Sequence, residues 1–354
     1  MFDRCRTPYW QAHLLDAWQS RGWTSRLLWP LSFVYRVVFS LYRLFGRWKL
    51  RSSDHPAVPL IVVGNVVAGG AGKTPLVIEL AKYFSKRGLA VGVISRGYGR
   101  RDQGYQKVTR ASPPALVGDE PLLIQLRAGC PVFVGPDRAE VARRLLASHP
   151  DTELIISDDG LQRQNLHRDV EIVVFDERGL GNGRLLPAGP LREPWPRQAD
   201  LVVYSGDSAP AAGFRVDRQL AMTALGSDGR IVSLEPWRSA PGPSPLLAVA
   251  GIARPQVFFD MLRATGLSLS QTIAMPDHDS FSDWPSRRPT GYTVLCTEKD
   301  AVKLWALDPD VLAVPLQCTL PAAFFIALDT LLIERGAEQR LAAKLSSAHG
   351  SQTT

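Results

Sequence analysis

A glycine-rich stretch that ends in Gly-Lys-Thr carries the clearest chemistry in this chain of 354 residues. A short apolar strand at residues 60–63 leads into it, and a helix with regular apolar spacing follows. A phosphate-binding loop requires this order, because backbone N–H groups and the positive end of the helix then face the phosphate oxygens. Lys73 would reach the β- and γ-phosphates, and the Thr74 hydroxyl would bind Mg²⁺.

The residues expected to hold the triphosphate are Gly69, Gly70, Ala71, Gly72, Lys73, Thr74 and Pro75. Pro75 is tolerated because the first helical turn has no intrahelical partner for the N–H that proline lacks. The usual first glycine, five residues before Gly72, is Val67. A glycine-rich turn with a chance lysine is the weaker alternative in this context. We therefore predict a nucleoside triphosphate site.

Acidic residues could complete this site. Asp158 and Asp159 follow a predicted strand at residues 153–157. A carboxylate at the end of such a strand commonly holds the Mg²⁺ water shell of P-loop enzymes, although a plain turn would use the same residues. Asp119, followed by Glu120, starts a predicted helix. It could accept a proton from an attacking hydroxyl, or it could simply be the helix N-cap.

Three further polar segments stay open on the residues alone. The loop at residues 95–100, which contains Arg96 and Tyr98, could contact phosphate or sugar, or its arginines could only be solvated. His278 lies among acidic residues that would orient and charge an imidazole, and a lone surface histidine is the alternative. Residues 297–300 start a helix and could form no more than a capped, salt-bridged first turn.

The elements that would position these groups alternate between strands and helices. Most predicted strands are near-continuous runs of Val, Ile and Leu, which is typical of parallel strands buried on both faces. They lie at residues 60–63, 90–95, 132–134, 153–157, 171–175 and 200–204, with helices at 75–87, 120–128 and 138–149. This alternation predicts an α/β fold of the P-loop NTPase type, with a doubly wound, mainly parallel sheet that binds ligands at the carboxyl ends of its strands.

Composition divides the chain into four parts. We expect a basic segment at residues 1–51, the P-loop core at 52–212, a smaller α/β domain at 213–345 whose last helix could pack back on the core, and a disordered tail at 346–354. The second domain should contain strands at 246–250 and 293–296 and helices at 255–265 and 321–334. Residues 178–197 form a long Gly/Pro loop whose Leu, Trp and Arg content favours an ordered functional segment.

The net charge of +7 is concentrated at the N-terminus, because residues 1–51 hold nine bases and two acids and the rest of the chain is neutral. This distribution indicates a local anionic partner and argues against a nucleic-acid groove. Within a predicted helix at residues 27–50, one face carries Arg36, Arg43 and Arg47, and the other carries Val34, Val37, Val38, Leu41, Phe45 and Trp48. The charges leave no stretch long enough to span a bilayer. We predict a helix that lies on an anionic membrane; packing on its own protein with a solvated basic face is the alternative.

The four cysteines, Cys5, Cys130, Cys296 and Cys318, form no CxxC pair. We expect reduced thiols in a protein that faces the cytosol. The sequence also lacks the pattern of a secretory signal peptide.

Together these motifs resemble the tetraacyldisaccharide 4'-kinases, the lipid A kinases of Gram-negative bacteria. The matching runs follow the family order over about residues 27–335. They include Gly64-Asn65, the phosphate loop, Ser95-Arg96-Gly97-Tyr98-Gly99, Gly118-Asp119-Glu120-Pro121, Asp158-Asp159-Gly160-Leu161-Gln162, residues 181–193, Asp277-His278 and residues 297–303. The run at 181–193 is highly specific, and Val67 agrees with the family's variant of the loop.

The resemblance implies transfer of the γ-phosphate of ATP, with Mg²⁺, to the 4'-hydroxyl of an acylated glucosamine disaccharide 1-phosphate. The product would be the 4'-phosphorylated lipid A precursor. It also implies a peripheral enzyme at the cytoplasmic face of the inner membrane, with its active site between the two domains. We expect a monomer.

Carried onto this sequence, the resemblance makes Asp119 the base for the sugar hydroxyl, with His278 tuning it, and places Lys73 and Arg192 on the phosphates. The implied metal residues are Thr74, Asp158, Asp159 and Glu120, and the implied substrate residues are Arg96, Tyr98, Asn182, Arg184 and Glu193. The alternatives are a membrane-associated P-loop ATPase or GTPase switch and a nucleotide-binding scaffold without catalysis. The run Thr297-Glu298-Lys299-Asp300 mimics a guanine motif but has Glu where Asn or Thr is expected.

Overall fold

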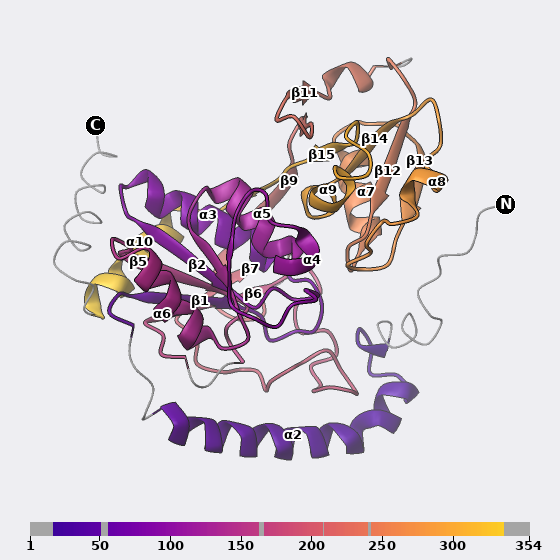
Figure 1. Ribbon diagram of the computed structural model, residues 1–354. Helices are drawn as coiled ribbons and strands as arrows, with labels where there is room; N and C mark the ends of the chain where they lie inside the picture. The colour runs from indigo at the N-terminus through magenta and orange to yellow at the C-terminus, as the bar shows by residue number, and fades with distance from the viewer. Residues whose placement is uncertain (1–16, 51–55, 163–165, 208, 240–241, 336–354) are drawn as a thin grey trace.

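The computed structural model describes residues 17–50, 56–162, 166–207, 209–239 and 242–335, with the backbone alone for residues 45–50. Two sheets, a short ribbon between them and a long surface helix make up its architecture (Figure 1). Residues 1–16 of the predicted basic segment, the last ten residues of the predicted second domain and the whole predicted tail at 346–354 lie outside the described residues.

The first sheet has the order β3-β4-β2-β5-β1-β6-β7-β8, and all its neighbours are parallel except β3 and β4. Its strands are β1 (Leu60–Gly64), β2 (Val91–Ser95), β3 (Gln106–Val108), β4 (Val132–Val134), β5 (Leu154–Asp158), β6 (Val170–Phe175), β7 (Leu201–Tyr204) and β8 (Phe214–Arg215). The chain first builds one side of β1 and then crosses to the other side with β6. The predicted doubly wound α/β fold is confirmed, and its switch point lies at β1, where such folds bind ligands.

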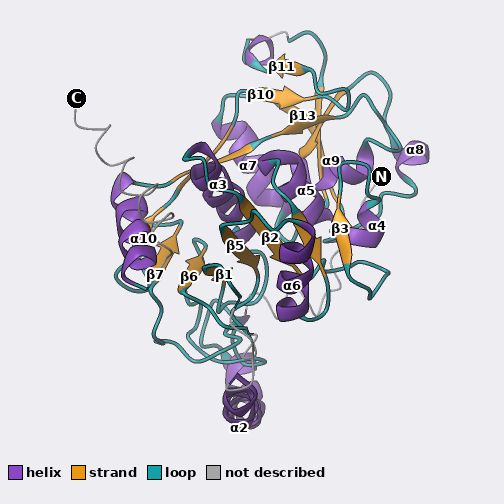
Figure 2. Ribbon diagram, turned by 60° about the vertical axis from the view of Figure 1, so that its left-hand side comes forward, coloured by secondary structure: helices purple, strands orange, loops and turns teal. Residues whose placement is uncertain are grey.

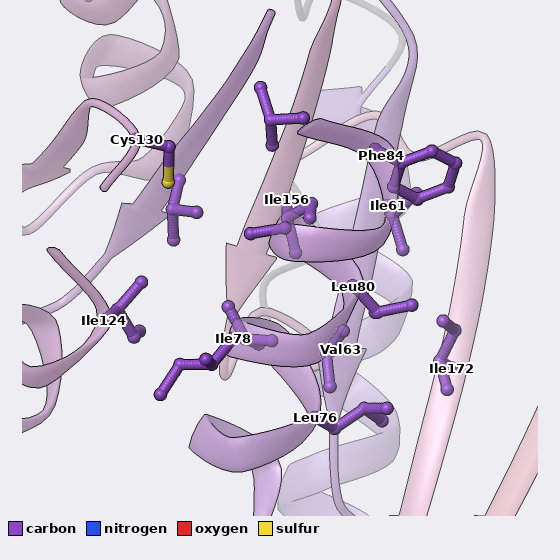
Figure 3. Packing of buried hydrophobic residues seen from close by; sticks show 14 of the residues in the cluster. Ile61, Val63, Leu76, Ile78, Leu80, Phe84, Ile124, Cys130, Ile156 and Ile172 are labelled. Carbon is purple, nitrogen blue, oxygen red and sulfur yellow. The ribbon is translucent and has the colours of Figure 1, made fainter. Parts of the chain in front are cut away.

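Helices α3 (Lys73–Lys86), α4 (Pro114–Val117), α5 (Asp119–Ala128) and α6 (Arg138–Ser148) cover this sheet. The helix after the phosphate loop, α3, buries Leu76, Leu80 and Phe84 at a spacing that places them on one face. They pack against strand side chains such as Ile61 and Ile172 (Figure 3). This core fixes the position of the phosphate loop, because the loop joins a buried strand to a buried helix.

The second sheet has the order β11-β10-β15-β14-β12-β13. Its strands are β10 (Thr223–Leu225), β11 (Ile231–Ser233), β12 (Leu246–Ala250), β13 (Leu269–Ala274), β14 (Thr293–Thr297) and β15 (Leu312–Val314). Its helical segments are η1 (Glu235–Trp237), α7 (Pro255–Ala264), α8 (Trp284–Arg287) and α9 (Glu298–Leu304). Strands β9 (Asp217–Leu220) and β16 (Leu316–Thr319) pair as an antiparallel ribbon between the two sheets.

Two segments cross the expected division near residue 213. Strand β8 pairs with β7, so the first sheet continues to Arg215. The last helix, α10 (Ala322–Glu334), returns to the first sheet and buries Phe324 and Leu328 in its core. The chain therefore passes from the first sheet to the second and back, through the two strands of the ribbon.

The long helix α2 (Trp23–Leu50) continues through Pro30 and lies apart from both sheets (Figures 1 and 2). Its inward face is polar: Ser25 donates a hydrogen bond to the Ala188 carbonyl, and Ser32 donates one to the Leu185 carbonyl. Its apolar side chains are exposed, among them Trp23, Leu27, Trp29, Leu31, Phe33, Val34, Val37, Val38 and Leu41. The alternative in which this helix packs its apolar face on its own protein is wrong. Among the described residues, no helix is long and apolar enough to cross a membrane.

The buried side chain of Leu80 allows a test of this core. We expect Leu80→Ala to lower the free energy of unfolding by about 3 kcal/mol, because it removes buried methyl groups and leaves a cavity. Chemical denaturation would measure the loss. Ile326→Ala, which changes an exposed side chain on α10, is the matched control. A loss below about 1 kcal/mol at Leu80 would contradict the packing described here.

Candidate active site

The phosphate loop is held in a defined shape at both ends. Gly72 caps α3 in a left-handed conformation with φ 77°, which favours glycine. Val67 forms an isolated antiparallel bridge with Leu191, and the Ala68 N–H donates to the Pro190 carbonyl over 2.7 Å. Valine suits this extended, paired position, which gives a physical reason for the missing first glycine.

Lys73 points toward polar groups at the ends of neighbouring strands. Its Nζ lies 3.1 Å from Oδ1 of Asn65 and 3.4 Å from Oδ1 of Asp159. Arg192 reaches the other oxygen of Asp159 at 3.8 Å. The structure thus gathers two cations around one carboxylate beside the loop, at the carboxyl ends of β1 and β5.

The two adjacent aspartates differ in their surroundings. Asp158 is buried and accepts a hydrogen bond from Ser95 over 3.2 Å, whereas Asp159 lines the cleft in a left-handed conformation with φ 53°. Burial, followed by the nearby carboxylates of Glu120 and Asp159, raises the pKa of Asp158 to about 7. Like charges this close disfavour full ionisation of all three groups unless a positive charge lies beside them.

These residues fit a magnesium ion. Oδ1 of Asp158 is buried and accepts no hydrogen bond from the described residues, and Thr74, Asp159 and Glu120 offer further oxygen atoms beside the loop. The described residues contain no group of three His, Cys, Asp or Glu side chains arranged to hold a metal by themselves. Mg²⁺ does not need such a group, since it commonly uses one or two carboxylates, waters and substrate phosphates.

Asp119 and His278 meet across the two sheets. Nδ1 of His278 lies 3.1 Å from Oδ2 of Asp119, although 159 residues separate them. Asp119 is the first residue of α5, whose N-cap is Gly118, so the interpretation of Asp119 as the cap is wrong. Burial alone would raise the pKa of Asp119, but the hydrogen bond from His278 and the charges of Lys299 and Lys303 lower it to about 2. Asp119 is therefore ionised at neutral pH.

The His278 side of this pair is equally constrained. His278 has φ 60°, an uncommon conformation for a residue with a side chain, and its ring lies 5.2 Å from the ring of Tyr98. The hydrogen bond with Asp119 raises its pKa, and burial and Lys299 oppose that rise. Lys299 also lies 3.0 Å from Glu120, and Lys303 lies 3.4 Å from Asp119.

A cavity of about 780 Å³ joins these groups. Residues from the first sheet line one wall and residues from the second sheet line the other; from the predicted site they are Gly69 to Pro75, Tyr98, Glu120, Asp159, Arg192 and His278. The second wall adds an apolar part formed by Ile252, Phe258 and Met261. Asp119 and Asp158 lie buried behind the lining.

Four predicted substrate residues do not line this cavity. Asn182 is buried, and its amide nitrogen donates to the carbonyls of Ala17, Ser20 and Ala188 and to the Ser25 hydroxyl. Arg184 donates to the same hydroxyl over 3.2 Å, and Glu193 is buried and bound by Arg197. Arg96 is exposed to solvent.

Sequence reasoning did not assign Lys299 and Lys303 to the site. Residues 297–300 form a capped turn, with Thr297 accepting from the Asp300 N–H. Lys299 of this turn also reaches Glu120, and Lys303 in the next turn of α9 reaches Asp119. The signal was present in their spacing, because residues four apart share one face of a helix. It could not show which acids that face would meet.

Comparison with known proteins gives a consistent result. The family model described as tetraacyldisaccharide-1-P 4'-kinase (LpxK) matches residues 24–333. A tetraacyldisaccharide 4'-kinase of Polaromonas naphthalenivorans is 50% identical over 350 residues, covering 96% of this chain and 99% of that relative. One from an Acidovorax species is 49% identical, with 95% and 96% covered. The crystal structure of the "apo" form of LpxK from Aquifex aeolicus in complex with ATP has a TM-score of 0.74 at 27% identity, covering 88% of this chain and 99% of that one.

The contact between Asp119 and His278 predicts a measurable titration. Since the hydrogen bond with Asp119 is the largest cause of the raised pKa of His278, we expect Asp119→Asn to lower that pKa. An NMR titration that follows the ring C–H signals of His278 against pH would measure this pKa. Asp283→Asn, which alters an exposed ion pair with Arg287, should leave it unchanged. An unchanged pKa in Asp119→Asn would refute the contact.

Proposed function

Since the chain belongs to the tetraacyldisaccharide-1-P 4'-kinase family, we propose a role for each wall of its cleft in moving a phosphoryl group from ATP to a lipid. The protein is an ATP-dependent tetraacyldisaccharide 4'-kinase of lipid A biosynthesis. The observation that carries the proposed mechanism is the Asp119–His278 pair, because His278 lines the same cavity as the phosphate loop and contacts Asp119 just behind that lining.

We assign Asp119 to the acceptor hydroxyl. Its carboxylate is ionised, and His278 and Lys303 fix its direction from the second sheet. A pKa of about 2 makes it a weak base, but the attacking hydroxyl in phosphoryl transfer mainly needs to be oriented, because the transition state is loose and its proton leaves late. His278 then acts as a positioning residue that can also share the released proton.

The first sheet supplies the phosphate chemistry. The loop at residues 69–75 would hold the β- and γ-phosphates, with Lys73 and Arg192 stabilising negative charge on the group in transfer. We propose that Thr74, Asp158, Asp159 and Glu120 hold Mg²⁺, which would neutralise phosphate charge when bound. The mutual repulsion of the three carboxylates, which raises the pKa of Asp158, supports this assignment. The apolar wall with Ile252 and Phe258 suits the nucleobase.

The acceptor side follows from the cavity lining. Tyr98 is exposed at the rim next to His278, where it could stack on a sugar ring of the acceptor. We propose only an indirect contribution from Asn182, Arg184 and Glu193, because hydrogen bonds within the protein occupy their side chains. Arg96 is exposed to solvent and does not line the cavity, so we assign it no direct contact with the acceptor either. We also propose that the enzyme works as a monomer, since one chain supplies both walls, and that residues 52–212 and 213–345 form its two domains, with β8 and α10 of the second range packed on the first sheet.

The exposed apolar side of α2 supports a position on the membrane. Its polar side is occupied by the loop at residues 178–197, so the apolar side chains face outward. Burying such a face in the headgroup region, beside the basic residues of the same segment, is favourable at an anionic surface. We propose peripheral attachment at the cytoplasmic face of the inner membrane, where the lipid acceptor would lie.

The transfer reaction tests the assigned residues. We expect Asp119→Asn to lower kcat by about 10²- to 10⁴-fold, because the hydroxyl loses its acceptor group, and Lys73→Ala to abolish transfer. The measurement follows label from the γ-phosphate of ATP into a tetraacyl-disaccharide 1-phosphate in mixed micelles. Asp283→Asn is the control. Phosphate release that needs no lipid, with no labelled product, would instead indicate the membrane-associated ATPase switch.

Membrane attachment has its own test. Val34→Glu/Val38→Glu places charges on the apolar side of α2, and we expect at least a tenfold loss of binding to vesicles that contain anionic lipid. Sedimentation with the vesicles would measure it. Ile231→Glu/Ile326→Glu is a matched control, because these side chains are similarly exposed but lie on β11 and α10. Equal binding by the two double variants would exclude attachment through α2.

A further inference from the structure

An arginine from the ribbon between the sheets contacts the phosphate loop and also lines the cavity. Arg218, on β9, donates from NH2 to the carbonyl of Ala71 over 2.8 Å. Its guanidinium lies directly on Gly72, where a Cβ would come within 2.3 Å of the same nitrogen. Gly72 therefore provides both the left-handed turn and the space for this side chain.

A second arginine binds the preceding part of the loop. Arg178 directs NH1 to the carbonyl of Ala68 at 3.3 Å and NH2 to the carbonyl of Gly70 at 3.4 Å. Its Nε lies 3.0 and 2.8 Å from the two oxygens of Asp176, a carboxylate that is almost fully buried. The guanidinium is thus fixed by Asp176 on one side and presented to the loop on the other.

Peptide geometry links these contacts to phosphate binding. In a trans peptide the C=O and the following N–H point in opposite directions. Holding the carbonyls of Ala68, Gly70 and Ala71 therefore directs the N–H groups of Gly69, Ala71 and Gly72 away from the two guanidinium groups and leaves these N–H groups to face a phosphate. A glycine-rich segment needs such support, because glycine restricts its own backbone least.

We propose that Arg178 and Arg218 are positioning residues that hold the phosphate loop in its binding shape by three of its carbonyl oxygens. This inference rests on the proposed phosphate loop. It assigns no direct contact with ATP to either arginine; each acts through the backbone of residues 68–72.

The same arginines connect the loop to the second sheet. Arg178 shares the carboxylate of Asp176 with Arg254, which precedes α7 and lies 3.3 Å from that carboxylate. Arg218 belongs to the ribbon through which the chain passes between the sheets, in register with Cys318 of β16. The shape of the loop thereby depends on how the second sheet is placed.

Steady-state kinetics of the full-length enzyme test the proposal. We expect Arg218→Met to raise KM for ATP roughly tenfold, as for the loss of one hydrogen bond from a charged donor, with KM for the lipid unchanged. Arg218→Lys should recover part of this loss, because a lysine can still donate to the Ala71 carbonyl. Arg178→Met should give a similar effect, and the double variant should change KM by less than the product of the two, since both act on one loop.

Controls separate positioning from general stability and from the proposed function. Arg230→Met, which alters an exposed pair with Asp228, should leave both KM values unchanged. An unchanged KM for ATP in Arg218→Met, while Lys73→Ala loses transfer, would overturn this inference alone. Equal losses toward ATP and lipid, with a lower unfolding temperature and no recovery by lysine, would also overturn it. If Lys73→Ala kept full activity, the proposed phosphate loop itself would fail. Should Arg218→Met not fold, Arg218→Lys and Arg178→Met decide the question by the same criteria.

Discussion

The pairing of the phosphate loop with the segment around Leu191 is the contact on which the rest of the site depends. Val67 bridges to Leu191, and the Arg192 N–H donates to the Val66 carbonyl over 2.7 Å. This short ladder aligns Arg192 with Lys73 around Asp159. The Tyr35 hydroxyl of α2 in turn donates to the Arg192 carbonyl over 2.7 Å. One backbone pairing therefore connects the nucleotide site to the surface helix.

Charge is divided between the two walls of the cleft. The wall formed by the first sheet contributes acids, namely Asp119, Glu120, Asp158 and Asp159. The wall formed by the second sheet contributes Lys299 and Lys303, which lie on one face of α9. The hydrogen bond from His278 and the charges of these two lysines keep Asp119 ionised. Burial and the neighbouring carboxylates instead raise the pKa of Asp158.

Helix α2 shows why an amphipathic pattern does not by itself define a buried face. Its serines and Tyr35 bind backbone carbonyls of the loop at residues 178–197, which satisfies polar groups that would otherwise be costly to bury. Asn182 extends this network with an amide that holds three carbonyls and a hydroxyl. The run at residues 181–193, which matches the family so specifically, therefore mainly binds α2 and positions Arg192.

The sequence by itself determined the family, the parallel sheet and the position of the phosphate loop. These depend on local order: buried apolar runs such as β1, apolar spacing in α3, and a glycine-rich turn between them. It also predicted the exposed apolar side of α2. The family resemblance already paired Asp119 with His278. Only the tertiary structure decided that Lys299 and Lys303 reach the acids of the first wall, that Asn182 and Glu193 are buried in structural hydrogen bonds, and that Arg178 and Arg218 donate to carbonyl groups of the loop. The physical reason is that these contacts join residues far apart in the chain, and their geometry is set by how sheets and loops pack, which local spacing does not encode.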